Sequence, residues 1–223
     1  MKLWKIYTKQ EQEYIDLMNG KTLVFNKNYS SFAEEIDPDL QHTYKWLAKQ
    51  LKVPSKYEFP FQLLHTVEGS TDPMNNKFFG IYNPGDYIIV IFDIDDKLVR
   101  LYDDDLFIIC LNHGYLSLSE AEDLEWENYI KFFPELGINP RKLFNDDYLN
   151  SLNNSQRNLA NTYLKAVYAS WNRIFNLYLK PSEWIVTVDK TIVGMTWTLH
   201  KDQISDIINF SVSESELKNY YDE

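Results

Sequence analysis

Cysteine is almost absent from this chain of 223 residues, which contains one, Cys110. A single cysteine cannot form a disulfide within the chain, so a small secreted fold held by disulfides is excluded. Cys110 lies within the apolar run 106–111, where burial raises the pKa of a thiol and keeps it from acting as a nucleophile. We therefore interpret Cys110 as a core residue.

Glycine and histidine are also scarce, at seven and four residues. The glycines are too dispersed for a phosphate-binding loop or a dinucleotide-binding turn, which argues against kinase and Rossmann functions. The Gly-x-Ser-x-Gly pattern of serine hydrolases is missing too. The histidines stand singly, with no partner at metal-ligand spacing, so we expect no zinc site. They are His42, His65, His113 and His200.

Long apolar runs are missing as well. A membrane-spanning helix needs about 20 apolar residues in succession, and the sequence offers no such run. The first residues, Met1-Lys2-Leu3-Trp4, lack the apolar stretch of a signal peptide. We expect a cytoplasmic protein that does not enter the membrane.

Aromatic and acidic residues are, by contrast, abundant. Hydrophobic residues make up 44% of the chain and aromatic residues 16%, which is enough apolar material to form a folded core. The formal net charge is −11, so the field of the protein repels phosphate backbones, and general nucleic-acid binding is disfavoured. An acidic surface fits an ordinary soluble protein, and it equally fits one that docks on a basic partner.

Two acidic clusters could in principle hold magnesium. Turn positions and helix starts account for both clusters without a metal, and we favour that interpretation. Their members are Asp93, Asp95, Asp96 and Asp103 to Asp105.

Periodicity and capping residues predict an α+β fold, with Thr8 and Ser119 as helix N-caps, a helix start at Asp103 to Asp105, and Gly20 as a helix stop. Strands are expected at 3–7, 22–25, 57–67, 87–94, 98–102, 184–188, 192–199 and 204–210. Helices are expected at 9–19, 38–51, 103–112, 119–133 and 155–179, with a long loop over 68–86 and a polar stretch over 145–154. We predict one domain over residues 1–210, with a central mixed or antiparallel sheet flanked by helices, and a polar, frayed tail over 211–223.

The order and spacing of several short motifs resemble an uncharacterised bacterial family catalogued as domain of unknown function 3841. The motifs span nearly the whole chain. They are Met1-Lys2-Leu3-Trp4, Tyr44-Lys45-Trp46-Leu47, Tyr57-Glu58-Phe59-Pro60-Phe61, the run from Leu111 to Glu120 (LNHGYLSLSE), Ser170-Trp171-Asn172-Arg173-Ile174-Phe175, and Trp197 before Gln203-Ile204.

The opening strand, helix, glycine and strand are also similar to the start of ADP-ribosyltransferase-like domains. In that fold the first strand carries a His or Arg that holds NAD, and Lys5 occupies the position here. A late strand there supplies a glutamate that stabilises the transition state, whereas 192–199 contains no acid. The family pattern has Gln where this chain has Val193, so we assign no catalytic residue.

The first function hypothesis follows from this resemblance. It is an ADP-ribosyltransferase-like protein, active or degenerate, that binds NAD or another nucleotide in a bacterial or phage conflict setting. Aromatic residues such as Trp46 would stack on nicotinamide or a base, and it stays open whether His113 lines a pocket. The residues predicted to bind the cofactor are Lys5, Tyr7, Thr8, Tyr44, His65 and Trp197.

The second hypothesis is a non-catalytic inhibitor or interaction protein whose acidic surface occupies a basic site on a partner. It predicts an exposed acidic or aromatic patch without a concave pocket.

Overall fold

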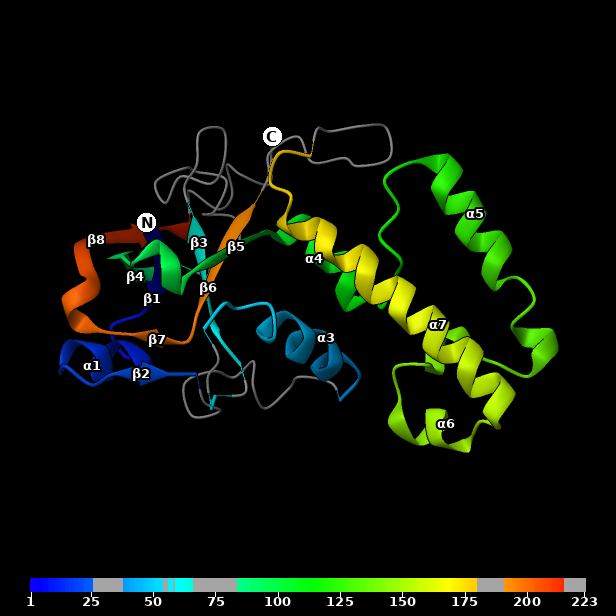
Figure 1. Ribbon diagram of the computed structural model, residues 1–223. Coiled ribbons are helices and arrows are strands. Elements are labelled where there is room, and N and C mark those ends of the chain that lie inside the picture. Colours follow the sequence, from blue (N-terminus) through cyan, green and yellow to red (C-terminus); the bar gives the residue numbers. More distant parts are fainter. Residues whose placement is uncertain (26–37, 54–55, 58, 66–83, 180–190, 215–223) are drawn as a thin grey trace. The chain divides into compact units, whose positions relative to one another are not determined.

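The structure is a computed structural model that describes residues 1–25, 38–53, 56–57, 59–65, 84–179 and 191–214 (Figure 1). The chain divides into two compact units, and each is formed from separate stretches of sequence. Unit 1 comprises residues 1–35, 47–101 and 189–223, and unit 2 comprises residues 36–46 and 102–188. No helix of the described part of the chain is long and apolar enough to cross a membrane.

Unit 1 is built on a six-stranded sheet with the strand order β5-β6-β3-β1-β4-β8. The strands are β1 (Lys2–Tyr7), β3 (Phe61–His65), β4 (Gly85–Asp93), β5 (Arg100–Asp103), β6 (Ile192–Thr196) and β8 (Ile204–Val212). The pairings of β1 with β3 and β4, of β3 with β6, and of β4 with β8 are antiparallel. A small ribbon pairs β2 (Leu23–Val24) with β7 (Thr198–Leu199). The predicted α+β class with an antiparallel sheet is confirmed.

A core cluster of unit 1 packs on one face of this sheet and draws on alternate residues of its strands, which point to the same side. Helix α1 (Gln12–Met18) and the β2–β7 ribbon add Leu17, Leu23 and Leu199 to that core. The sheet itself contributes Leu3, Tyr7, Phe61, Leu63, Ile88, Val90 and Phe92.

Close packing of this core requires glycine at position 194 in β6. A Cβ atom built there would lie 2.7 Å from one methyl carbon of Leu3 and 2.8 Å from the other. Both distances are shorter than van der Waals contact, so a larger residue would force the Leu3 side chain to move.

Several predicted boundaries in unit 1 were wrong. The first helix begins at Gln12 rather than residue 9, and Glu11 instead of Thr8 is its N-cap residue. The strand expected over 192–199 is interrupted at Trp197, which separates β6 from β7. The last strand continues to Val212, because this residue is buried and pairs with Gly85. The expected strand at 184–188 lies outside the described residues, as does most of the expected loop.

Unit 2 is helical. Its elements are α4 (Asp104–Leu111), α5 (Glu120–Ile130), α6 (Asp146–Ser151), α7 (Asn154–Trp171) and most of α3 (Pro38–Ala48). The helix start predicted at Asp103 and the cap predicted at Ser119 are confirmed, since their side chains accept hydrogen bonds from the backbone N–H groups of Leu106 and Glu122. Figure 1 shows α7, in yellow, as the longest helix of this unit.

Two predictions in unit 2 need correction. The polar stretch 145–154 contains the short helix α6, whose N-cap is Asn145. The longest helix ends at Trp171 and not near 179, because the chain tightens into a 3-10 turn over Asn172–Phe175. Its start was close to the prediction, with a capping box between Asn153 and Gln156.

Candidate functional site

Lys5 and Tyr7, two of the residues predicted to bind NAD, meet at a buried carboxylate. Both belong to β1, and the next helix supplies Glu13, which is 3% exposed. One oxygen of Glu13 accepts a hydrogen bond of 2.7 Å from Lys5 Nζ and another of 2.7 Å from the Tyr7 hydroxyl. The ammonium also lies 5.6 Å from the centre of the Phe61 ring. Lys5 is therefore held by groups of unit 1.

Burial and the negative charge of Glu13 raise the pKa of Tyr7 well above its ordinary value. The phenol consequently stays protonated and donates to Glu13 at every physiological pH. Because Tyr7 is fully buried, this cluster works as a structural junction between β1 and α1.

The substitution Glu13→Gln tests that junction. It leaves the Lys5 ammonium without its counter-ion, and we expect the free energy of unfolding to fall by about 2 kcal/mol, since Lys5 is partly exposed and water can compensate in part. Urea unfolding followed by circular dichroism measures this loss. Glu11→Gln is the control, because its exposed side chain accepts a hydrogen bond from the Thr8 backbone N–H and makes no ion pair among the described residues. An equal loss in both variants would contradict the assignment.

The structure places the other predicted residues in separate surroundings. Thr8 contributes its backbone N–H to Glu11, and Trp197 donates from Nε1 to the carbonyl of Val53 at 2.6 Å. His65 lies opposite Leu3 in the sheet, with Nδ1 2.8 Å from the Lys2 carbonyl oxygen.

The strand register separates His65 from Tyr7. Tyr7 is four residues further along β1 than Leu3, which amounts to roughly 13 Å at about 3.3 Å per residue. Tyr44 belongs to unit 2, where it packs edge-on against Phe107. The role of these residues in NAD binding stays a prediction.

Two of the motifs that indicated the family resemblance are joined by hydrogen bonds in unit 2. The segment 114–118 follows α4, and residues 170–173 span the end of α7 and the start of the 3-10 turn after it. Ser170 Oγ accepts from the Leu116 N–H, Trp171 Nε1 donates to the Gly114 carbonyl at 2.7 Å, and Arg173 donates to the Leu116 carbonyl. These contacts fix the loop that leads into α5.

Arg173 also pairs with Glu122 of α5, at 2.5 Å. The guanidinium is the main reason that the pKa of Glu122 falls to about 2, and hydrogen bonds from the Leu118 N–H and the Tyr115 hydroxyl add to the effect. The ionised carboxylate of Glu122 therefore contributes fully to stability above pH 4.5, its ordinary pKa, and this contribution is lost as the pH falls towards 2.

A cavity of about 320 Å³ opens in unit 2 between the end of α4 and the start of α6. Two of its six lining residues come from the 3-10 turn Pro140–Lys142, and the others lie after α4 or around the N-terminus of α6. The lining residues are His113, Arg141, Lys142, Phe144, Asn145 and Tyr148.

The lining combines two cations with an aromatic stack. The rings of His113 and Phe144 lie 4.0 Å apart and 11° from parallel, and Phe144 is in turn stacked 5.6 Å from Trp171. His113 has a positive φ of 57°, a conformation uncommon outside glycine that asparagine, aspartate and histidine adopt more often than other residues. The turn at His113 directs the chain from α4 into the loop held by Arg173.

Backbone hydrogen bonds order the rim of the cavity. Asn139 accepts from the Arg141 N–H, and the Tyr148 hydroxyl accepts from the Asn139 N–H at 2.6 Å. The Asn145 side chain caps α6 by accepting from the Tyr148 N–H. The side chains of Arg141 and Lys142 are exposed. The arrangement can bind an anion beside an aromatic ring.

Comparison with known protein families assigns the chain to one of them. A family model described as a domain of unknown function (DUF3841) matches residues 5–205. The chain belongs to this family. No curated protein and no solved structure matches it. The DUF3841 match covers all of unit 2 and most of unit 1, with the Lys5–Glu13–Tyr7 cluster and the cavity inside it. The description of the family names no activity, so the function of this DUF3841 member has to be inferred from its own residues.

Sequence reasoning named Lys5, Tyr7 and His113 but missed Glu13, Arg141 and Lys142. Glu13 could have been found, because it precedes the buried Leu17 by four residues and so shares its helix face. The adjacent cations Arg141 and Lys142 were passed over because they lie in a polar region with no helical period.

Proposed function

We propose that this DUF3841 member binds a nucleotide in the cavity of unit 2, with NAD as the first ligand to test. The observation that carries the proposal is the combination of two cations and a stacked histidine in one cavity of an acidic chain. Ligand sites of proteins commonly enclose about 300 to 1,000 Å³, so the volume favours a group the size of one nucleotide half of NAD.

The phosphate end of such a ligand would lie against Arg141 and Lys142. A guanidinium matches two phosphate oxygens at once, and an ammonium adds a point charge. The local charge differs from that of the whole chain, whose acidic surface would repel the same group elsewhere. Asp146 and Asp147 begin α6 close by in sequence, but they do not line the cavity.

The ring end would be recognised by the aromatic side of the cavity. His113 is already stacked on Phe144, and a nucleobase or nicotinamide ring could extend that stack. Each stacked base contributes about 1 to 3 kcal/mol in proteins that bind single-stranded nucleic acid, which sets the scale expected here. The Asn145 carboxamide and the Tyr148 hydroxyl supply polar groups at the same rim.

ADP-ribosyl transfer is the activity that we propose to assay, on the resemblance of the first strand and helix. Lys5 and Glu13 provide a cation and an acid in unit 1, but they are paired with each other. The cavity is therefore the better place to look for bound NAD. A cytoplasmic role in conflict between bacteria and phages stays a prediction.

The test is binding of NAD and of ADP, measured by calorimetry and by thermal shift, together with an assay for nicotinamide release. A ligand that binds only the folded chain stabilises it by about 2.7 kcal/mol at 100 times its Kd. We expect Arg141→Glu with Lys142→Glu to weaken binding at least 30-fold, because both phosphate contacts become repulsive.

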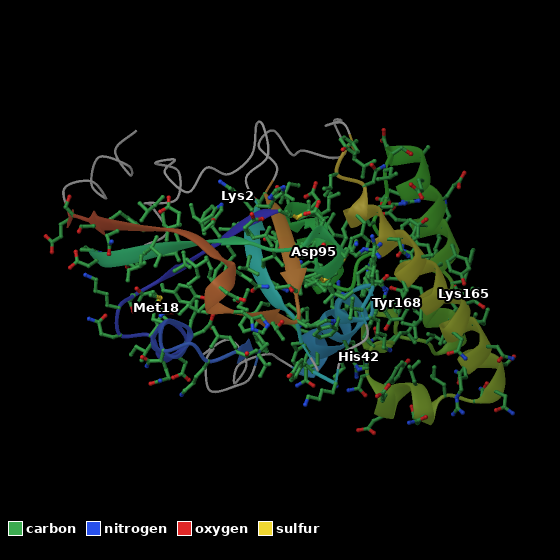
Figure 2. The ribbon with its side chains drawn as sticks, turned by 60° about the vertical axis from the view of Figure 1, so that its left-hand side comes forward. Lys2, Met18, His42, Asp95, Lys165 and Tyr168 are labelled. Carbon is green, nitrogen blue, oxygen red and sulfur yellow. The ribbon has the colours of Figure 1, made fainter. Side chains whose placement is uncertain are left out.

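Lys97→Glu with Lys165→Glu is the matched control. It makes the same change of charge at exposed lysines outside the cavity, and Lys165 is labelled on α7 in Figure 2. We expect this control to bind like the natural chain. Failure of NAD and ADP to bind at millimolar concentration, or equal weakening in the two double variants, would disprove the proposed site. Nicotinamide release lost in Lys5→Ala and Tyr7→Phe, but not in the cavity variant, would move the active site to unit 1.

A further inference from the structure

Helix α5 is unusual because none of its eleven residues is buried. A helix of this length is marginal by itself in water, so packing must hold it in place. Trp126 supplies much of that packing on one side, where its ring stacks on Tyr115 at 4.2 Å and lies 5.1 Å from Tyr163. The ion pair between Glu122 and Arg173 is on the same side.

The opposite side of α5 and the turn after it expose large apolar residues. Leu124 is 58% exposed, Phe132 is 55% exposed, and Leu136 is 49% exposed. Leu124 and Asn128 are four residues apart and share one helix face, and Phe132 follows after another four. Single exposed apolar residues are ordinary, whereas three within thirteen positions concentrate apolar surface on one segment, as is common at interaction sites.

The segment that carries these apolar residues is also rich in carboxylates. The segment 119–136 contains six acidic residues against one lysine, Lys131. One of the six, Glu122, is neutralised by Arg173. Four others are exposed, namely Glu120, Glu125, Glu127 and Glu135. We call the three exposed apolar residues and these four carboxylates the α5 face.

We propose that the α5 face is a docking surface for a basic amphipathic segment of a partner protein. Charge complementarity selects this occupant, because a cluster of carboxylates repels acidic proteins and nucleic acids and attracts lysine and arginine. The exposed leucines and phenylalanine match apolar anchors placed between those cations, as in helices that bind apolar grooves. The carboxylates speed the encounter, and burial of the anchors holds the complex.

The probe is a short fluorescent peptide of lysine and leucine, with the leucines at helical spacing, and a second peptide in which serine replaces each leucine. Fluorescence anisotropy at physiological salt measures the Kd of each. We expect the leucine peptide to bind at least tenfold more tightly than the serine peptide. Leu124→Ser with Phe132→Ser should weaken binding of the leucine peptide at least tenfold, and Glu125→Gln with Glu127→Gln should weaken both peptides.

Leu98→Ser with Leu159→Ser, and Asp147→Asn with Asp202→Asn, are the controls, since they remove exposed apolar or acidic groups elsewhere. Circular dichroism and the melting midpoint verify that each variant folds. Equal weakening by the control pairs would show that the peptide does not bind at the α5 face and would overturn the proposal. A dimer in sedimentation that Leu124→Ser with Phe132→Ser dissociates would assign the face to a second copy of the chain, which also overturns it.

Discussion

Trp171→Ala is expected to lower the free energy of unfolding by about 4 kcal/mol. The side chain is completely buried, and replacing such a tryptophan by alanine costs about 3 to 5 kcal/mol through lost burial and the cavity left behind. The rings of Phe144, Tyr168 and Trp46 all pack against it, at 5.6, 5.0 and 5.2 Å between ring centres. Urea unfolding followed by far-ultraviolet circular dichroism measures the loss.

Trp171→Phe separates packing from hydrogen bonding. It keeps a ring in the stack but removes the donor to the Gly114 carbonyl, and we expect a loss of about 1 to 2 kcal/mol. Tyr178→Ala is the control, because that side chain is 92% exposed and should change stability by less than about 0.5 kcal/mol. If Trp171→Ala cost no more than this control, the aromatic stack would not be part of the core.

Asp104→Asn is expected to stabilise the protein at pH 8 but not at pH 4. Burial raises the pKa of Asp104 to about 6, the charges of Asp105 and Asp103 add to the rise, and the Tyr102 side chain opposes it. Folding therefore disfavours the ionised carboxylate, and the penalty grows as the pH rises from about 4 through 6. We expect a gain of about 1 to 2 kcal/mol at pH 8, after loss of the favourable charge at the start of α4.

The measurement is the urea midpoint of the variant and the natural chain at both values of pH. Asp147→Asn is the matched control, since Asp147 also begins a helix but is exposed. Its effect should be small and similar at the two values. A stabilisation by Asp104→Asn that persists at pH 4 would have to arise from packing and not from the ionisation of this carboxyl.

The sequence allowed good prediction where local chemistry decides the outcome. The strand at 3–7, the caps at Asp103 and Ser119, and the stop at Gly20, which has a φ of 82°, follow from alternation, hydrogen-bonding side chains and the freedom of glycine. Cys110 is buried, and its pKa is raised, as its apolar run predicted.

Prediction failed where the structure of a segment depends on residues that are distant in the sequence. Helix α6 has few apolar side chains, so its polar stretch looked like a loop, and only the Asn145 cap and packing on α7 make it helical. The junction at Glu13 depends on how α1 turns back over β1, which periodicity does not reveal. The cavity brings together residues 113 and 141–148, and no local pattern reports that such segments meet.

The division of the chain into interleaved units has a consequence for its synthesis on the ribosome. The nascent chain presents β1 at once and β4 after 85 residues, but the neighbours of β3 and β4 in the sheet, β6 and β8, are translated only from residue 192 onward. The residues of unit 2 are by then complete. We therefore expect the helical unit to form during translation, while the sheet waits with open edges for the last stretch of polypeptide, when the growing chain is most exposed to aggregation and to chaperones.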